Sequence, residues 1–121
     1  MDCIFCKIIE GSIPSKTIYE DEIVKVFMDI NPNSMGHLLI IPKKHIKDLT
    51  EMDDETFGHM NSVIKKMYTL LKEKLNFDGL RVLQNNGIIQ EVKHYHIHMV
   101  PYYKHISEEK SVDEIFEIIT K

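Results

Sequence analysis

The spacing of hydrophobic and polar residues changes along this chain, and it predicts strands in one part and a helix in another. Between Thr17 and Pro42, short apolar runs rich in β-branched and aromatic residues are separated by polar stretches. Such runs are typical of strands, and they predict extended segments at residues 17–20, 23–28 and 37–41. The connection at residues 29–36 is rich in Asn, Pro and Gly, which favour turns. We therefore expect hairpin-like connections, with the second one at the surface.

From Asp54 onward the apolar residues recur every three or four positions, which is the period of one helix face. The stripe consists of Phe57, Met60, Ile64, Met67, Leu71 and Leu75. Acidic residues at positions 53–55 suit the positive end of a helix dipole. The pattern predicts one long amphipathic helix that ends at residues 76–79.

The rest of the chain returns to extended patterns before a short closing helix. We expect a strand at 80–83, a tight connection at Asn85-Asn86-Gly87, a strand at 92–100 and a helix at 111–119. Strands, one long helix and then more strands indicate an α+β fold. The predicted architecture is a mainly antiparallel five-stranded sheet with one long helix and a short C-terminal helix. A chain of 121 residues is the size of one domain, so residues 1–121 are expected to form a single one.

Composition narrows the classes of partner. The formal net charge of −4 argues against binding to a nucleic acid polymer, because that binding requires clustered Lys and Arg. No run approaches the ~18 apolar residues of a membrane helix, and the first residues lack the pattern of a signal peptide. We therefore expect a cytoplasmic protein without membrane contact, and a small anionic ligand remains open.

Three histidines in alternation are the strongest chemical signal. His94, His96 and His98 lie in the predicted strand at 92–100, where alternate side chains share one face. The rise of ~3.3 Å per residue would space neighbouring triad residues by ~6.6 Å along the strand, which forms a row without direct stacking. Neutral imidazoles can attack phosphorus, transfer protons or stabilise charge. They could also bind a catalytic metal, since H-x-H can supply two ligands. The residues alone do not assign these roles.

Two cysteines, Cys3 and Cys6, have C-x2-C spacing. This spacing alone is a weak signal that metal sites, redox motifs and ordinary reduced thiols share. Further ligands are needed before it predicts a metal site.

The residues His94 to Val100 resemble the signature of the histidine triad (HIT) superfamily, in which three histidines alternate with apolar residues. Three further blocks are similar in the right order: Cys3–Ile9 with Ile13-Pro14, Phe27–Pro32, and Gly36–His45. The resemblance covers nearly the whole chain. It implies the fold of that superfamily and a homodimer.

The resemblance also implies roles at the site. The middle histidine, His96, would attack the α-phosphate of a purine nucleotide substrate and form a nucleotidyl-histidine that water hydrolyses. His98 and Gln90 would hold the phosphoryl oxygens, and Asn85 would lie near the leaving group. A nucleoside pocket would comprise Phe5, Phe27, Asp29 and Ile30, in which Phe27 and Ile30 sandwich the base and Asp29 accepts hydrogen bonds from the ribose.

Zinc-containing members of the superfamily complete the cysteine pair with two histidines. The matching positions here are His45 and His94, so Cys3, Cys6, His45 and His94 would bind Zn²⁺. Cys2His2 is a closed tetrahedral set, which is typical of structural zinc. His37, His59 and His105 receive no chemical role.

This sequence departs from the pattern of the superfamily in one segment. Ile89 stands where relatives often have Gly, and the loop at residues 85–90 is about two residues shorter than is usual in them. Glu91 stands where some relatives have Ser. The predicted function is hydrolysis of nucleoside 5′-phosphoramidates or related nucleotidyl conjugates. The alternatives are dinucleoside polyphosphate hydrolysis, nucleotidyl transfer, and non-catalytic nucleotide binding.

Overall fold

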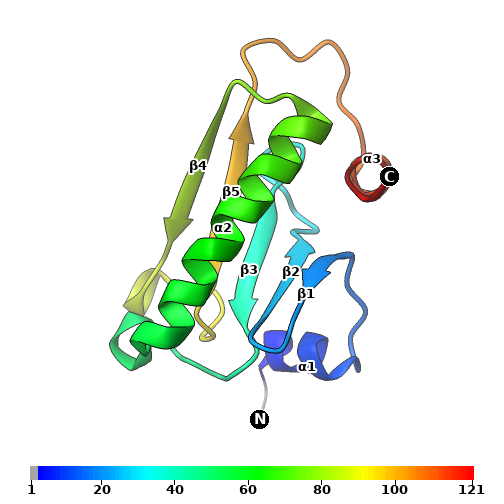
Figure 1. The fold of residues 1–121 in the computed structure, drawn as a ribbon. Coiled ribbons are helices and arrows are strands. Elements are labelled where there is room, and N and C mark those ends of the chain that lie inside the picture. Colours follow the sequence, from blue (N-terminus) through cyan, green and yellow to red (C-terminus); the bar gives the residue numbers. More distant parts are fainter. Residues whose placement is uncertain (1–2) are drawn as a thin grey trace.

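The structure, a computed structural model, describes residues 3–121 and contains one five-stranded sheet. The strands are β1 (Thr17–Glu20), β2 (Val24–Met28), β3 (Leu38–Pro42), β4 (Gly79–Gln84) and β5 (Ile97–Tyr102). The helices are α1 (Ile4–Glu10), α2 (Asp54–Leu75) and α3 (Val112–Thr120), with short 3₁₀ turns η1 (Leu49–Glu51) and η2 (Gly87–Ile89). The strand order is β1-β2-β3-β5-β4, and every neighbouring pair is antiparallel (Figure 1). The predicted α+β fold is confirmed.

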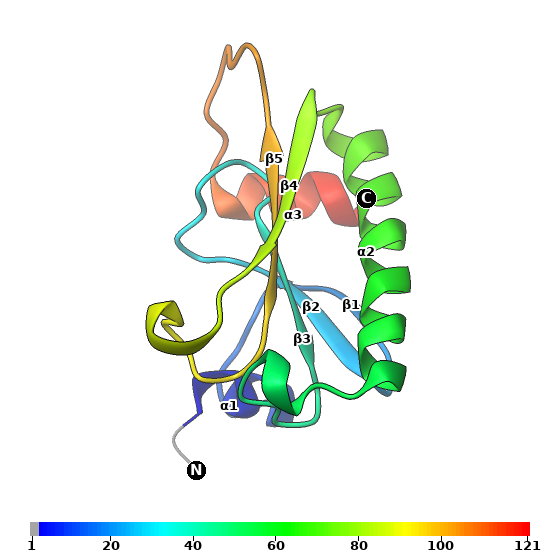
Figure 2. The ribbon, with the colours of Figure 1, turned by 90° about the vertical axis from the view of Figure 1, so that its left-hand side faces the viewer.

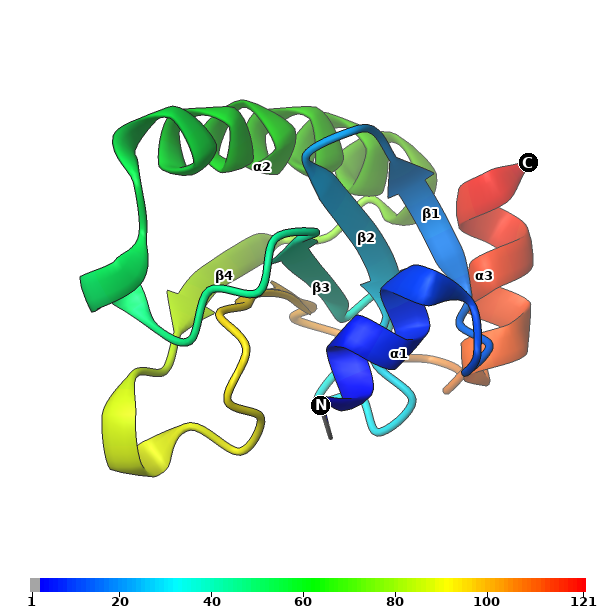
Figure 3. The same cartoon turned by 90° about the horizontal axis from the view of Figure 1, so that it is seen from below.

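Two apolar layers lie on opposite faces of the sheet. Helix α2 covers one face, while α1 and the loop with η2 lie on the other (Figures 2 and 3). Along β2, Val24, Val26 and Met28 join the larger core under α2 and α3, whereas Phe27 joins a smaller cluster with α1. This alternation follows from the period of two along a strand. The site is built on the face that carries α1.

Helix α2 begins and ends with side-chain and backbone caps. The Asp53 carboxylate accepts a hydrogen bond from the Thr56 backbone N–H at 2.9 Å, which satisfies one of the free donors at the helix start. At the other end Asn76 adopts φ 48°, and its N–H donates to the Lys72 carbonyl. Met60, Met67 and Leu71 of the predicted stripe are buried, and the remaining members are partly buried against the same core. The prediction of one long amphipathic helix is confirmed.

The predicted strand at 92–100 is wrong in its first half. Strand β5 begins at Ile97, and residues 85–96 form a wide loop that contains η2, so the predicted tight connection at 85–87 is also wrong. The pairing of β4 with β5 ends at Gln84 and Ile97, and before that point the Tyr95 N–H donates to the Ile46 carbonyl instead. Side chains still alternate, because Tyr95, Ile97 and Met99 all reach the core under α2.

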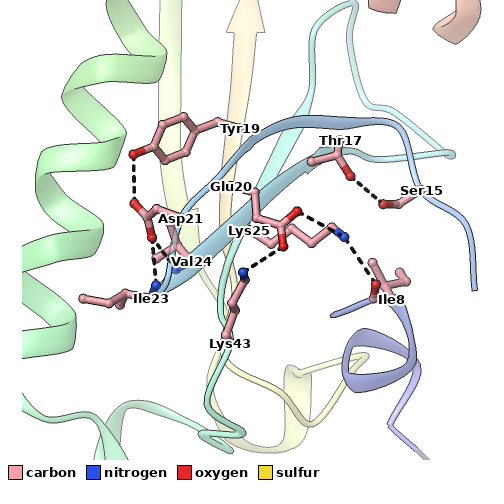
Figure 4. A network of polar contacts seen from close by, with 10 residues as sticks. All are labelled: Ile8, Ser15, Thr17, Tyr19, Glu20, Asp21, Ile23, Val24, Lys25 and Lys43. Carbon is pink, nitrogen blue, oxygen red and sulfur yellow. Dashed lines mark hydrogen bonds and ion pairs between the residues drawn. The ribbon is translucent and has the colours of Figure 1, made fainter. Parts of the chain in front are cut away.

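Helix α1 was not predicted from the sequence, and long-range contacts hold it on the sheet. The Lys25 ammonium, on β2, donates to the Ile8 carbonyl of α1 at 3.4 Å (Figure 4). Glu20 lies 3.7 Å from the same ammonium and 2.7 Å from that of Lys43. Lys25 is only 9% exposed, so this lysine reaches α1 through the interior. The contact fixes the C-terminal end of the helix that carries Phe5 and Cys6.

No helix within residues 3–121 combines the length and the apolar character that a membrane span requires.

Candidate functional site

The three histidines of the triad lie on the α1 side of the sheet and form a row. The ring centroids of His96 and His98 are 4.9 Å apart, with an interplanar angle of 61°. The expected ~6.6 Å is a spacing of residues along a strand, from which the two rings can lean toward each other, and only His98 belongs to β5. The Phe5 ring contacts both His94 and His96 edge-on, at 5.9 and 5.0 Å. Helix α1 therefore packs directly against the triad.

The contacts of His96 leave one ring nitrogen free. Its Nδ1 donates to the backbone carbonyl of His94 at 2.8 Å, and a carbonyl can only accept, so the proton is assigned to Nδ1. Its Nε2 then carries the lone pair, and no described residue hydrogen-bonds to it. His96 is 4% exposed, and burial lowers its pKa. The side chain is thus held as a neutral imidazole with one available nucleophilic nitrogen.

A chain of hydrogen bonds sets the opposite tautomer in His98. The Asn33 backbone N–H donates to Nδ1 of His37 at 3.1 Å, so the proton of His37 is on Nε2. That Nε2 donates to Nδ1 of His98 at 3.0 Å, which places the proton of His98 on its own Nε2. Burial is the main cause that lowers the pKa of His98 to about 4. His98 is therefore a neutral hydrogen-bond donor.

Two cavities meet at His96 and His98. The polar cavity, about 340 Å³, is lined by Asp29, Asn31, Asn33, His37, Leu83, Asn85, Glu91, His96, His98 and Val100. The apolar cavity, about 220 Å³, is lined by Ile4, Phe5, Ile8, Ile13, Pro14, Ser15, Phe27, Met28, Asp29, Ile30, Leu39, Glu91, Val92, His96 and His98. Both cavities therefore share the two imidazoles and the two carboxylates. The arrangement suits a ligand with an apolar ring at one end and a polar group at the other.

The apolar cavity contains every residue predicted for the nucleoside pocket. Phe5 and Phe27 are buried and meet edge to face at 5.7 Å, while Ile30 is 77% exposed at the rim. One oxygen of the Asp29 carboxylate accepts the Asn31 N–H at 2.9 Å, and the other lies 3.6 Å from Nε2 of His37. The carboxylate is thereby oriented at the boundary of the two cavities.

The structure separates the two polar residues predicted to contact the phosphate and leaving group. Asn85 lines the polar cavity, but Gln90 lines neither cavity. Gln90 is 4% exposed, and its amide nitrogen donates to the Lys47 carbonyl at 2.6 Å. Its carbonyl oxygen is buried without a hydrogen-bond partner among the described residues. Glu91, the next residue, lines both cavities.

The four predicted metal ligands converge beside the triad. One ligand atom each of Cys3, Cys6, His45 and His94 lies within 4.8 Å of the others. Nδ1 of His45 is 3.2 Å from Nδ1 of His94 and 3.2 Å from Sγ of Cys6, and Sγ of Cys3 is 3.4 Å from Nδ1 of His94. Ligands of a tetrahedral zinc ion lie roughly 3.3–3.8 Å apart. The cluster could therefore hold a metal ion.

The surroundings of this cluster suit a cation. Nε2 of His94 donates to the Pro42 carbonyl at 2.8 Å, which leaves the lone pair of Nδ1 facing the cluster. Burial and the neighbouring Cys3 raise the pKa of the Cys6 thiol to about 11, so a cation would be needed to stabilise its ionised form. The other group of potential ligands within residues 3–121 is Asp29, His37 and His98. Neither group contains His96, so neither brings the three histidines of the triad together as ligands.

His37 has a place in the site that the sequence does not predict. It is 2% exposed, contacts His98 and lies beside Asp29, whereas the sequence pattern predicts only the start of a strand there. It precedes β3, whose neighbour β5 carries His98, but only the register between the two strands brings these rings together. Its position after Gly36 carried no chemical signal in the sequence.

Comparison of the sequence with known proteins identifies a family and several relatives. The model of the HIT domain matches residues 10–105. An uncharacterized HIT-like protein of Methanocaldococcus jannaschii is 49% identical over 104 residues, which cover 84% of this chain and 80% of that protein. The adenosine 5′-monophosphoramidase hnt1 of Schizosaccharomyces pombe is 40% identical over 103 residues, which cover 84% of this chain and 74% of that protein.

A solved structure matches nearly the full length. The crystal structure of a zinc-bound histidine triad family protein from Mycobacterium smegmatis superimposes with a TM-score of 0.90 at 34% identity. The match covers 99% of this chain and 91% of that one.

Proposed function

This chain belongs to the HIT domain family, and on that premise we propose that it hydrolyses nucleoside 5′-phosphoramidates through a nucleotidyl intermediate on His96. The substrate would be a purine nucleotide whose α-phosphorus carries an amine. The products would be a nucleoside monophosphate and the free amine. The name of the similar fission yeast protein, an adenosine 5′-monophosphoramidase, supports this substrate class.

The observation that carries the proposal is the free Nε2 of His96 at the junction of the two cavities. Its other nitrogen is held by the His94 carbonyl, so Nε2 is fixed in place with its lone pair available. A nucleoside in the apolar cavity would set its α-phosphate at the shared boundary, because His96 and His98 line both cavities. Fixing the nucleophile and phosphorus in this way replaces a bimolecular encounter with an oriented one.

The first step forms one bond and breaks one. Nε2 of His96 attacks phosphorus, the P–N bond to the amine breaks, and the amine leaves with that electron pair and takes a proton from water. In the second step a water molecule attacks phosphorus, and the bond to His96 breaks. The water proton is released, and His96 returns to its neutral form. This is two-step covalent catalysis.

His98 would stabilise the charge that develops on the phosphoryl oxygens. Its Nε2–H is set by the contact from His37, so it can donate without first changing its protonation. Asp29, at the rim of the nucleoside pocket, would accept hydrogen bonds from the ribose hydroxyls. Asn85 lines the polar cavity on the leaving-group side.

The metal cluster would have a structural role. Zinc would be held by a closed tetrahedral set of Cys3, Cys6, His45 and His94. Such a set cross-links the chain and leaves no coordination position open for substrate. Because His94 and α1 both belong to this set, the metal would hold the N-terminal helix against the triad. The zinc-bound relative from M. smegmatis supports zinc as the metal.

Steady-state kinetics test the activity. Wild-type protein is expected to release AMP from an adenosine 5′-phosphoramidate, and His96→Ala is expected to release none above background. His105→Ala, which alters an exposed histidine in the C-terminal segment, is the matched control and should retain activity. If wild type binds AMP tightly but turns nothing over, non-catalytic nucleotide binding replaces this proposal.

A further inference from the structure

The charge on the walls of the site points to the kind of leaving group it accepts. Of the described residues that line the polar and apolar cavities, none is a lysine or an arginine, and two are carboxylates, Asp29 and Glu91. We propose that the amine released by this protein carries a second, protonated amino group, and that Glu91 selects for it. This inference rests on the proposed hydrolysis at His96 and names the class of its substrate.

The polar cavity is the place for the leaving group. Phe5, Phe27 and Ile30 give the apolar cavity the rings and aliphatic surface that suit a base. The polar cavity extends from the same two imidazoles toward Asn33, Leu83 and Asn85 instead. A ligand that binds its base in the first cavity and its phosphate at His96 would therefore direct the amine into the second cavity, beyond which an adjoining cavity is lined by Arg81. At 340 Å³, that cavity can accommodate a short aliphatic chain.

Glu91 is the carboxylate that remains for the leaving group. One oxygen of Asp29 already accepts the Asn31 N–H, and the proposed function assigns this carboxylate to the ribose hydroxyls. Glu91 makes no hydrogen bond or ion pair with any residue in the described part of the chain, and it is exposed at the mouth of both cavities. The ammonium of Lys93, two residues on, donates to the Gly87 carbonyl at 2.7 Å. Within residues 3–121, the Glu91 carboxylate at the wall of both cavities therefore forms no ion pair.

The negative charge of Asp29 and Glu91 would distinguish three classes of leaving group. An anionic leaving group, such as the phosphate chain of a second nucleotide, would meet two carboxylates and no basic side chain among the described lining residues. A neutral alkylamine would meet no repulsion and gain no attraction. An amine with a distal ammonium would pair with Glu91 in the manner of a surface ion pair. The proton that the scissile nitrogen takes on cleavage still comes from water, so Glu91 is a specificity residue and has no part in proton transfer.

Three matched substrates test this inference. They are adenosine 5′-phosphoramidates of a pentylamine chain that ends in an ammonium, a methyl or a carboxylate group. Wild-type protein is expected to show the highest kcat/KM for the substrate that ends in an ammonium, a lower value for the methyl and the lowest for the carboxylate. Each step should change kcat/KM by about fivefold, which is the upper limit for one exposed ion pair. The preference should shrink as salt is added.

Variants then assign the effect to one residue. In Glu91→Gln the ratio of kcat/KM between the ammonium and carboxylate substrates is expected to fall toward one. Glu22→Gln, an exposed glutamate in the turn between β1 and β2, removes the same charge elsewhere and should keep the wild-type ratio. Equal kcat/KM for all three substrates, or an unchanged ratio in Glu91→Gln, would overturn the inference while the proposed hydrolysis stands. Failure of wild type to release AMP from any of them would overturn both.

Discussion

Nε2 of His37 lies 3.0 Å from Nδ1 of His98, and the Asn33 N–H occupies the other nitrogen of His37. Each ring can satisfy this arrangement with only one neutral tautomer. A backbone amide in the loop before β3 therefore determines which nitrogen of His98 faces the ligand. The relationship joins the loop before β3 to β5 and involves a residue outside the triad motif.

Replacement of His37 is expected to lower kcat through this contact. His37→Phe removes the donor to Nδ1 of His98 and should reduce kcat by up to the roughly 10²–10³-fold that accompanies loss of an oxyanion donor. His37→Gln can still donate from its amide and should recover part of the rate. The measurement is kcat and KM for AMP release by both variants. Equal losses in both, with KM and kcat affected alike, would indicate a packing role only.

Loss of one ligand should release the metal from the N-terminal cluster. His45→Ala leaves three of the four ligands, and elemental analysis of the purified variant is expected to show much less zinc per chain than wild type. The melting temperature should fall by at least about 5 °C, since roughly 1 kcal/mol shifts it by several degrees in a chain of this size. Zinc content and melting temperature that match wild type would contradict the assignment of His45.

Asp21 is expected to contribute to stability in a pH-dependent way. Burial raises the pKa of its carboxyl, but hydrogen bonds from Val24 N–H, His59, Ile23 N–H and Tyr19 outweigh that effect and hold it well below 3.8. A carboxyl with a depressed pKa stabilises the fold above its unfolded value, and that contribution is lost as pH falls. Asp21→Asn should therefore lower the free energy of unfolding near pH 7 by about 1–3 kcal/mol.

The same substitution should also flatten the decline of stability at acid pH. Denaturant unfolding at a series of pH values measures this, and the difference between wild type and Asp21→Asn should shrink below about pH 4. Glu22→Gln changes the exposed neighbouring glutamate and serves as the control. A difference that is constant across the pH range would show that the ionised carboxylate is not the source of the stability.

Substitution by alanine is expected to have opposite effects on stability at two glycines. Gly36 has φ +88°, and a Cβ there would lie 2.5 Å from Cδ1 of Leu75, so Gly36→Ala should destabilise the fold by about 1–2 kcal/mol. Gly58 lies within α2 with no atom within 4 Å of an added Cβ, and Gly58→Ala should stabilise it by about 0.5–1 kcal/mol. Thermal or denaturant unfolding of both variants tests the pair, and effects of the same sign would contradict the backbone assignment.

The sequence predicted the parts of this molecule that depend on local pattern. The apolar stripe of α2 and the short strands follow from side-chain periodicity, which burial on the sheet then enforces. The four candidate metal ligands could be predicted only because the resemblance to a family joins Cys3 and Cys6 to two distant histidines. The cytoplasmic location and the homodimer stay predictions.

The remaining features depend on contacts that no local pattern encodes. Helix α1 has seven residues, too few to be stable alone, and its ends are held by Cys3 and by Lys25 from β2. The loop at residues 85–96 leaves the sheet because the Tyr95 N–H pairs with Ile46 rather than with β4. His37 enters the site only through the pairing of β3 with β5. In each case tertiary structure decides what the sequence leaves open.

Direct detection of the proposed covalent intermediate is the most decisive test of the proposed mechanism. Wild-type protein would be mixed with an adenosine 5′-phosphoramidate, quenched at alkaline pH within the first turnover, and examined by intact and peptide mass spectrometry. We expect an added AMP group on the peptide that contains His96, present in wild type and absent in His96→Ala with zinc retained. AMP release by wild type without any adduct on His96, or an adduct that persists in His96→Ala, would contradict the account.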